Sequence, residues 1–330
     1  MKKQSWQKDF KEASNAIPLL KEHLQLKEKL TLMKGGHFQT KVPASFISRI
    51  NPNDPKDPLL LQVVKKININ NARGTNDPLN ERALAKDGLI KKYKSRALII
   101  TTQACPIHCQ YCFRQHFNYA DNLSSKDNYN AVIKTIHEDD ALNEVILSGG
   151  DPLSLSNHKL GSLLNKIDNI EHIKTIRLHT RFPIAIPSRI NDKFINILGN
   201  IRANLVVVIH CNHPNEIDSD VKRALLKLSE LSKLTLLNQS VLLKDINDSA
   251  STLIKLSHKL FKYGVLPYYL HLLDPVTNSE HYEVSTRLTK KIYEEIRTEL
   301  PGYLLPRLVK EVPGESSKIP YELLDENTVN

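Results

Sequence analysis

The pattern of hydrophobic and polar residues becomes regular at Arg96. From there to Leu300, short apolar runs alternate with longer segments whose apolar residues recur at helical spacing. The short runs predict six buried strands: RALIITTQA, EVILSGG, TIRLHT, LVVVIH, LTLLNQS and LPYYLHLL. Each is followed by a predicted helix, and the last helix ends before Pro301 and Gly302. Strands that alternate with helices in this way indicate a parallel sheet with right-handed crossovers.

Six strand–helix units are too few for a complete eight-unit barrel, so the pattern predicts an α/β protein with an open, partial TIM-like (β/α)6 barrel. In such folds, ligands bind at the C-terminal ends of the strands. Polar residues at or just after these ends should therefore converge on one mouth. They are Cys105, Ser148, Gly149, Gly150, His179, His210, Asn238, Gln239 and Asp274.

The flanking regions show a different pattern. KDFKEASNAIPLLKEHLQL predicts one or two amphipathic helices, and VPASFISRI is apolar at roughly helical spacing. NPNDPKDPLL, at 51–60, carries three prolines and predicts a loop. We therefore divide the chain into a helical N-terminal region (1–95), a (β/α)6 core (96–303) and a C-terminal segment (304–330).

The chain has a formal net charge of +10. Such a balance can indicate nucleic-acid binding, but the lysines are spread along the sequence and no dense arginine tract or RNA-recognition aromatic pattern occurs. We interpret the charge as a solvated surface that can steer small anions. No apolar run is long enough to cross a bilayer, and the N-terminus does not resemble a signal peptide. These features predict a cytoplasmic protein with no membrane or nucleic-acid partner.

Three of the four cysteines lie in ACPIHCQYCFRQHF, at Cys105, Cys109 and Cys112. Four cysteines in a chain of this size do not make a disulfide scaffold, so the cluster suggests metal binding. Structural zinc usually takes four protein ligands, and a 4Fe–4S cluster normally takes four thiolates. Three thiolates would leave one iron open to a substrate or cofactor. A partial zinc site, three buried cysteines, or an RNA-binding protein with a structural cluster are the alternatives.

The CxxxCxxC spacing directly after the first core strand, with Tyr111 before the last cysteine, resembles the radical S-adenosylmethionine (SAM) superfamily over residues 96–280. The resemblance implies that the three cysteines hold a 4Fe–4S cluster, that its open iron binds SAM, and that an external donor supplies an electron. LSGGDPL resembles the superfamily's Gly-Gly-acid element. The implied SAM-pocket residues are Ser148, Gly149, Gly150, Asp151, His210 and Gln239.

EVPGESSKIP, taken together with PYYLHLLD and the cysteine motif, resembles the lysine 2,3-aminomutases within that superfamily. The resemblance implies that Lys318 forms a Schiff base with pyridoxal 5′-phosphate (PLP). It also implies that Arg114 binds the carboxylate of L-lysine and that Asp274 and Glu311 bind its far ammonium group. Glu311 departs from the family, which has an aspartate there. The implied ligands of the PLP phosphate are Tyr93 and Arg96.

The segment after Lys318 contains no cysteine, whereas longer family members carry a zinc-binding segment there. With PGESSK before it, this form resembles the aminomutase that serves elongation factor P. The resemblance implies an isomerase that converts L-lysine to (R)-β-lysine, which a separate ligase attaches to the factor. The alternative is a 2,3-aminomutase of general metabolism that acts on another free amino acid, such as glutamate or ornithine.

Overall fold

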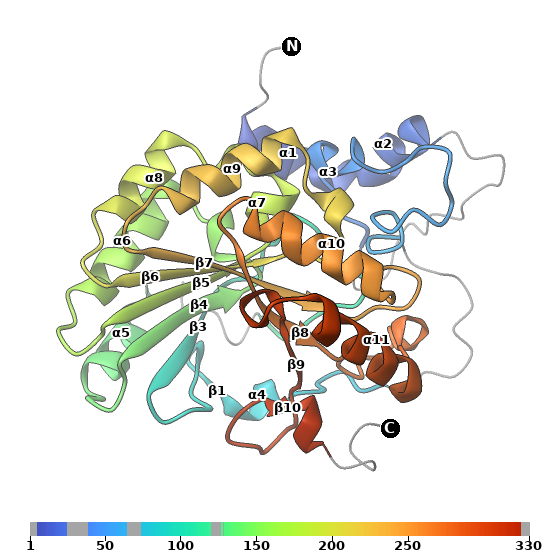
Figure 1. Ribbon diagram of the computed structural model, residues 1–330. Coiled ribbons are helices and arrows are strands. Elements are labelled where there is room, and N and C mark those ends of the chain that lie inside the picture. The colour runs from blue at the N-terminus through green and yellow to red at the C-terminus, as the bar shows by residue number, and fades with distance from the viewer. Residues whose placement is uncertain (1–4, 25–38, 65–73, 120–126, 128, 325–330) are drawn as a thin grey trace.

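The computed structural model describes residues 5–24, 39–64, 74–119, 127 and 129–324. Its centre is one ten-stranded sheet in the order β1 to β10 (Figure 1). All six predicted strands are confirmed, and each pairs in parallel with the next. They are β3 (Arg96–Thr102), β4 (Glu144–Gly149), β5 (Thr175–Thr180), β6 (Asn204–His210), β7 (Leu234–Val241) and β8 (Leu266–His271).

Six predicted helices wrap around the outside of the curved sheet (Figure 1). They are α5 (Asn130–His137), α6 (Asn157–Asp168), α8 (Asp192–Gly199), α9 (Ser219–Ser229), α10 (Ala250–Phe261) and α11 (Thr286–Glu299). Five of them begin after a residue whose side chain accepts a hydrogen bond from the first turn, which satisfies a backbone N–H that has no partner in the helix. These caps are Ser156, Asn191, Asp218, Ser249 and Ser285.

The strands place apolar residues beneath the helices and polar residues toward the inside of the barrel. In β5, Ile176 and Leu178 are fully buried in the core, while the alternate residues Arg177 and His179 line an internal cavity. This arrangement follows from the two-residue period of a strand, which sends successive side chains to opposite faces. The barrel interior is therefore available for polar chemistry.

Both edges of the sheet carry strands that the hydrophobic pattern does not predict. At one edge, β1 (Ala85–Lys86) and β2 (Leu89–Ile90) add antiparallel to β3. At the other, β9 (Arg307–Lys310) lies parallel to β8, and β10 (Ile319–Pro320) pairs antiparallel with β9. The sheet order ends at β1 and β10, so the barrel is open as predicted.

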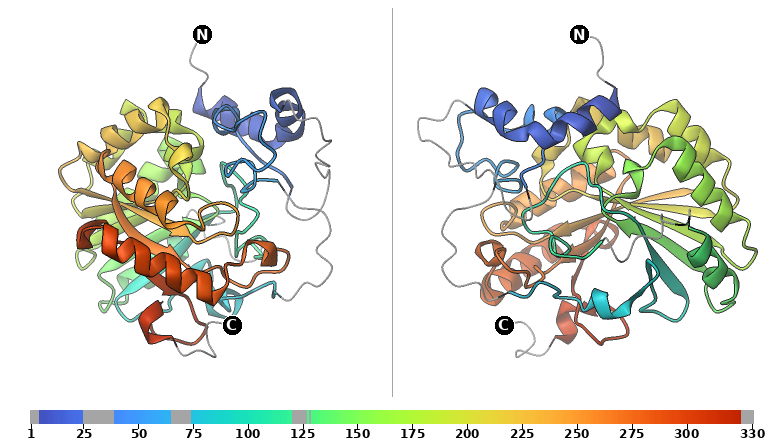
Figure 2. Two further views of the ribbon diagram at one scale, coloured as in Figure 1. Left: turned by 45° about the vertical axis from the view of Figure 1, so that its right-hand side comes forward. Right: turned by 180° about the vertical axis from the view of Figure 1, so that it is seen from behind.

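The prediction of a helical N-terminal region is confirmed by α1 (Trp6–Glu12), α2 (Ala16–His23) and α3 (Ala44–Ile47) but is wrong at β1 and β2. Short α4 (Glu81–Leu84) precedes them, and residues 51–60 form turns, as expected of a loop. Residues 25 and 26 of the predicted amphipathic helices lie outside the described residues. The views in Figure 2 place α1–α3 on one side of the molecule and the β9–β10 hairpin on the opposite side. Within the described residues, no helix combines the length and apolarity needed to cross a bilayer.

Candidate active site

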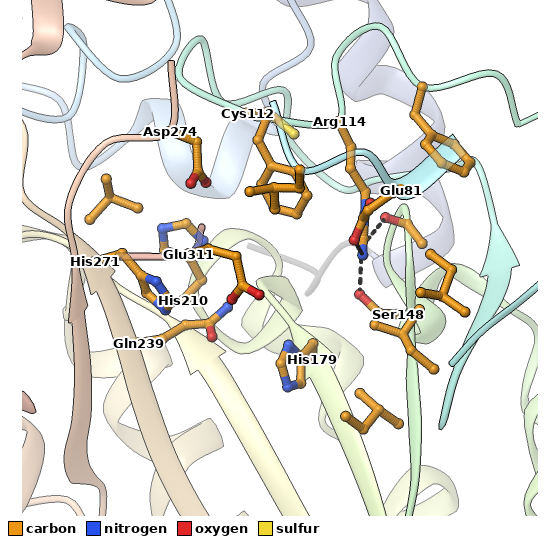
Figure 3. Close-up of a pocket in the computed structure, with 18 of the residues that line it drawn as sticks. Glu81, Cys112, Arg114, Ser148, His179, His210, Gln239, His271, Asp274 and Glu311 are labelled. Atoms are coloured by element: carbon orange, nitrogen blue, oxygen red, sulfur yellow. Dashed lines mark hydrogen bonds and ion pairs between the residues drawn. The ribbon is translucent and has the colours of Figure 1, made fainter. Parts of the chain in front are cut away.

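A cavity of about 1220 Å³ opens inside the barrel at the C-terminal ends of the strands (Figure 3). It brings together nearly all the residues that the sequence places at the site. They are Tyr93, Arg96, Cys105, Cys109, Cys112, Arg114, Ser148, Gly149, Gly150, Asp151, His179, His210, Gln239, Asp274, Glu311 and Lys318.

Asn238 is the exception among the residues at strand ends. Its side chain is buried, accepts from Cys211 N at 2.9 Å and donates to Ser240 Oγ at 2.9 Å. Gln239, the next residue of β7, lines the cavity instead. The prediction that Asn238 faces the mouth is wrong because neighbouring strand residues point to opposite faces.

The cysteine loop follows β3 and presents three partly exposed thiols to the cavity. Cys112 N donates to Cys109 O at 3.0 Å, which closes the turn between these two residues. Burial raises the pKa of Cys112 to about 12, and the nearby Cys109 adds to the effect. Burial also raises the pKa of Cys105, with Asp151 and the other two cysteines contributing. The raised pKa values of Cys105 and Cys112 mean that these thiols ionise only beside a cationic partner, and a metal deprotonates its thiol ligands.

No group of three or more His, Cys, Asp or Glu within the described residues is arranged to hold one metal ion. A 4Fe–4S cluster makes a different demand, because each thiolate ligand binds a different iron. The soft sulfur donors on one loop beside a large cavity fit that demand.

Gly149 and Gly150 hold the end of β4 against the start of the cysteine loop. Gly150 N donates to Thr102 O at 2.6 Å, and Gly149 has a φ of +113°. A Cβ on Gly150 would lie 2.5 Å from Ala104 O. The sequence predicts that these glycines allow a close backbone approach to a ligand. In the structure, the close approach is to the chain's own loop.

We expect Gly150→Ala to destabilise the protein by about 1–3 kcal/mol, because the loop backbone must move away from the new methyl group. Iron content after anaerobic reconstitution should fall as well. Gly161→Ala is the matched control: it lies within α6, and its Cβ would be 3.6 Å from Ile197 Cγ2, an ordinary contact. That variant should gain about 0.5–1 kcal/mol and keep its iron. Thermal unfolding and iron analysis test both variants. Equal iron content in the two variants would contradict the role of Gly150 in supporting the cysteine loop.

Asp151 is buried and its carboxylate is bonded within the fold. It accepts from Thr180 Oγ1 at 2.8 and 3.0 Å, from Arg181 N at 2.7 Å and from Leu153 N at 3.0 Å. Burial raises its pKa to about 7, although these hydrogen bonds act to lower it. Asp151 thus ties the β4 turn to the end of β5. Its place in the SAM pocket stays a prediction.

His210 lies deep in the cavity beside the cysteine loop. Its Nε2 is 3.3 Å from the hydroxyl oxygen of Tyr111. Burial, and then the charge of Arg181, lower the pKa of His210 to about 3, so the ring is neutral at physiological pH. A neutral imidazole can donate or accept a hydrogen bond, which suits the predicted place in a cofactor pocket.

Arg114 already binds a carboxylate with a bidentate fork. Its Nε and Nη2 donate to the two oxygens of Glu81 at 2.6 and 2.7 Å, and Nη1 donates to Ser148 Oγ at 2.9 Å (Figure 3). The guanidinium thus has the geometry that the sequence assigns to it for a substrate carboxylate. Glu81, from α4, is missed by sequence reasoning, because an isolated acid in a short helix gives no signal.

The β9–β10 hairpin brings the predicted PLP lysine to the cavity. The pairing of Lys310 with Ile319 sets their neighbours Glu311 and Lys318 beside each other, and the two side chains form an ion pair. Lys92, also missed by sequence reasoning, contacts the other oxygen of Glu311. Burial opposes ionisation of Glu311, but Lys318 and then Lys92 lower its pKa. Glu311 therefore forms ion pairs with two lysines of the chain itself. Its contact with substrate stays a prediction.

Asp274 differs from the other carboxylates of the cavity. In the part of the chain that the structure describes, no side chain forms an ion pair or hydrogen bond with it. Burial raises the pKa of Asp274 to about 7; Lys318 lowers it and Glu311 raises it. Asp274 and Arg114 enter the cavity from opposite sides (Figure 3). An acidic group at one side and a basic group at the other can orient an amino acid with a cationic side chain.

Comparisons with known proteins agree with this geometry. Residues 99–250 match the model of the Radical SAM superfamily. The chain is 45% identical to the L-lysine 2,3-aminomutase of Buchnera aphidicola subsp. Baizongia pistaciae, over 86% of this chain and 84% of that protein. It is 43% identical to that of Escherichia coli, over 87% and 84%, and 40% identical to that of Haemophilus influenzae, over 96% of each.

The superfamily match covers the cysteine loop, and the similarity to the aminomutases extends well beyond it. Membership of the superfamily implies a 4Fe–4S cluster and SAM, which the donor set of the cysteine loop fits. The chain therefore belongs to the L-lysine 2,3-aminomutase family, a family of isomerases within the radical SAM superfamily.

Proposed function

We propose that this chain is a PLP-dependent L-lysine 2,3-aminomutase that forms (R)-β-lysine. The observation that carries the proposal is the arrangement of one cavity, in which the cysteine loop, Lys318, Arg114 and Asp274 all meet. When bound, the cluster, SAM and PLP supply a one-electron route for moving an amino group between adjacent carbons. The protein orients the substrate for that step and excludes water from it.

The residues around Lys318 fit PLP, which combines an aldehyde with an anionic phosphate. Lys92, Arg96 and Lys318 line this part of the cavity, and the Arg96 guanidinium lies 3.7 Å from the centre of the Tyr93 ring. Nε2 of His179 is buried and has no hydrogen-bond partner within the described residues. A cationic wall and an unpaired ring nitrogen suit a polar, anionic cofactor.

Arg114 and Asp274 support lysine as the substrate. The Arg114 fork would hold the α-carboxylate in place of Glu81, and Asp274 would accept hydrogen bonds from the far ammonium group. A glutamate bound the same way would set its second carboxylate against Asp274, which is repulsive. Ornithine keeps the ammonium group but is one methylene shorter, so its turnover tests whether the cavity selects the length of the side chain.

We further propose that the product serves elongation factor P through a separate ligase, in the cytoplasm and with an external electron donor. The PGESSK segment, which ends at Lys318, supports this branch of the family. The chain also spans 96% of the Haemophilus influenzae relative but 67% of the L-lysine 2,3-aminomutase of Clostridium subterminale, to which it is 32% identical.

The test is anaerobic incubation of the reconstituted protein with SAM, PLP, dithionite and either L-lysine, L-ornithine or L-glutamate. Chiral chromatography of the products should show (R)-β-lysine from lysine and little turnover of the other two. Faster turnover of ornithine or glutamate would favour the alternative of general amino-acid metabolism.

A second assay adds elongation factor P and its ligase to the lysine reaction. The factor should gain the mass of one lysyl group only when the aminomutase is active. Failure of the factor to accept the (R)-β-lysine formed would remove the proposed link while leaving the isomerase activity standing.

A further inference from the structure

A buried network of polar and charged groups lies directly beneath the cysteine loop. Its centre is an ion pair between Arg181, just after β5, and Glu216, after β6, with Nη2 and Oε2 3.0 Å apart. Arg181 is 5% exposed and Glu216 is 0% exposed. Two opposite charges so far from water are costly unless their geometry supplies many hydrogen bonds.

The guanidinium of Arg181 reaches the cysteine loop itself. Nη1 donates to Cys109 Sγ and, at 2.8 Å, to the hydroxyl oxygen of Tyr111. Nη2 donates to Gln62 Oε1 at 2.6 Å as well as to Glu216. One buried cation therefore touches a cysteine sulfur with one nitrogen and its counter-ion with the other.

Glu216 is held as an anion by several donors. Its Oε1 accepts from Asn212 N at 2.8 Å, from His213 N at 2.9 Å and from Gln62 Nε2 at 3.2 Å. Burial raises the pKa of Glu216, but Arg181 and these bonds outweigh it and leave the pKa lowered. The Arg181–Glu216 pair thus contributes one positive and one negative charge, with the positive charge nearer the sulfur.

The N-terminal region completes this support. Gln110 N, within the cysteine loop, donates to Gln62 O at 3.0 Å, while the Gln62 side chain joins the network below. His108 N donates to Lys41 O at 2.9 Å. Residues before the barrel therefore hold the loop at two further points besides its contact with Gly150, which gives the N-terminal extension a role at the site.

We propose that the Arg181–Glu216 pair positions Cys109 and sets the reduction potential of the iron–sulfur cluster. Hydrogen bonds to the sulfurs and the net charge nearby are the main means by which a protein tunes such a cluster. A buried cation at a ligand sulfur stabilises the reduced cluster, which carries one more electron, and so raises the potential. The anion behind it offsets part of that effect. Glu216 is not among the residues that line the cavity, and Arg181 contacts the cysteine loop, so both act as positioning residues.

Removing each charge should shift the potential in opposite directions. Arg181→Met removes the cation and should lower the midpoint potential. Glu216→Gln removes the counter-ion and should raise it, while Arg181→Lys keeps the charge but loses the planar fork and should give a smaller decrease. The measurement is a titration of the reconstituted full-length protein with dithionite, which supplies one electron per cluster, followed by electron paramagnetic resonance.

Arg189→Met is the matched control. Arg189 is also fully buried, but it donates to Leu153 O at 2.8 Å and to Asn157 Oδ1 at 2.8 Å, away from the cysteine loop. Its loss should lower stability and leave the midpoint potential unchanged. If the substitutions acted only by loosening the barrel, Arg181→Met and Arg189→Met would instead shift the midpoint potential alike.

Shifts of the same sign for Arg181→Met and Glu216→Gln would overturn the proposal. Should Arg181→Met fail to fold or to retain iron, unchanged midpoints in both Arg181→Lys and Glu216→Gln would overturn it equally. The inference rests on the cluster that the family implies but not on the lysine substrate. Absence of a cluster signal in the unaltered protein would refute the proposed function itself, whereas a cluster with unaffected potentials would refute only this inference.

Discussion

Lys318→Ala is expected to abolish covalent attachment of PLP and to slow lysine turnover by about 10³-fold or more, since the nucleophilic amine is lost. The structure gives the reason for the choice of lysine. The β9–β10 pairing fixes Lys318 at the cavity wall, and Glu311 holds its amine there. Visible absorbance of the purified protein reports attachment. Borohydride reduction followed by peptide mass spectrometry locates the modified lysine.

Two further variants separate this role from a general effect of removing a lysine. Lys290→Ala, on the exposed side of α11, should keep both PLP and activity. Lys92→Ala tests the rival amine, because Lys92 also contacts Glu311 in the same cavity. It should weaken PLP binding without removing the covalent link. A link that persists in Lys318→Ala and disappears in Lys92→Ala would contradict the assignment.

Glu311 gains a clearer role from the same geometry. Its carboxylate joins two lysines, so loss of the positive charge of Lys318 on attachment to PLP would leave Lys92 as its partner. Glutamate reaches farther by one methylene than the aspartate that the family resemblance implies at this position. The longer side chain lets one group pair with both amines, whereas Asp274 forms no ion pair within the described part of the chain.

The barrel could be predicted from sequence because each of its strands is a short buried apolar run and each following helix has an amphipathic period. The edge strands could not, because pairs such as Ala85–Lys86 and Ile319–Pro320 are too short to show any period. They form because the backbone groups of their neighbours β2 and β9 are available for hydrogen bonding. The pairing of β10 with β9 also brings Lys318 to Glu311.

The site could be predicted where a motif marks it and not where only folding brings residues together. The cysteine spacing predicts the metal ligands, and the strand ends locate most of the residues that line the cavity. Glu81 and Arg114 are separated by 32 residues, and Arg181 and Glu216 by 34, so no local pattern pairs them. Asn238 is the reverse case, a residue wrongly predicted to face the cavity. Neighbouring side chains of β7 point to opposite faces of the sheet, and that of Asn238 points away from the cavity. Polar residues at strand ends should therefore be assigned to a mouth only after their face is known.

Asp274→Asn is expected to lower kcat/KM for lysine by about 10²–10³-fold, because the buried ammonium group of the substrate would lose the carboxylate that we propose as its main counter-ion. Burial raises the pKa of Asp274 to about 7, so the free carboxyl is ionised above that pH and neutral below it. Lysine binding to the unaltered protein should therefore weaken as the pH falls from 8 to 6. In Asp274→Asn the part of this dependence that is due to Asp274 should disappear, leaving only any contribution of Asp151, whose pKa burial also raises to about 7.

Three of the histidines that line the cavity do not titrate in the range of that measurement. Burial lowers the pKa of His179 and His271 well below the usual value and that of His210 to about 3, so these rings stay neutral between pH 6 and 8. Asp192→Asn, at an exposed position, is the control and should keep both activity and its pH dependence.

The free energy of unfolding gives an independent test of the raised pKa of Asp274. A folded-state pKa above the ordinary value of 3.8 means that the unfolded chain releases this proton first, so stability falls as the pH rises from about 3.8 to about 7 and then levels off. Asp274→Asn should therefore raise the free energy of unfolding at pH 8 by about 1–3 kcal/mol, and this gain should shrink towards zero below about pH 3.8, where the carboxyl is neutral in both states. A variant that is less stable at pH 8, or that binds lysine as tightly as before, would show that Asp274 is a structural group and not the site of the substrate ammonium.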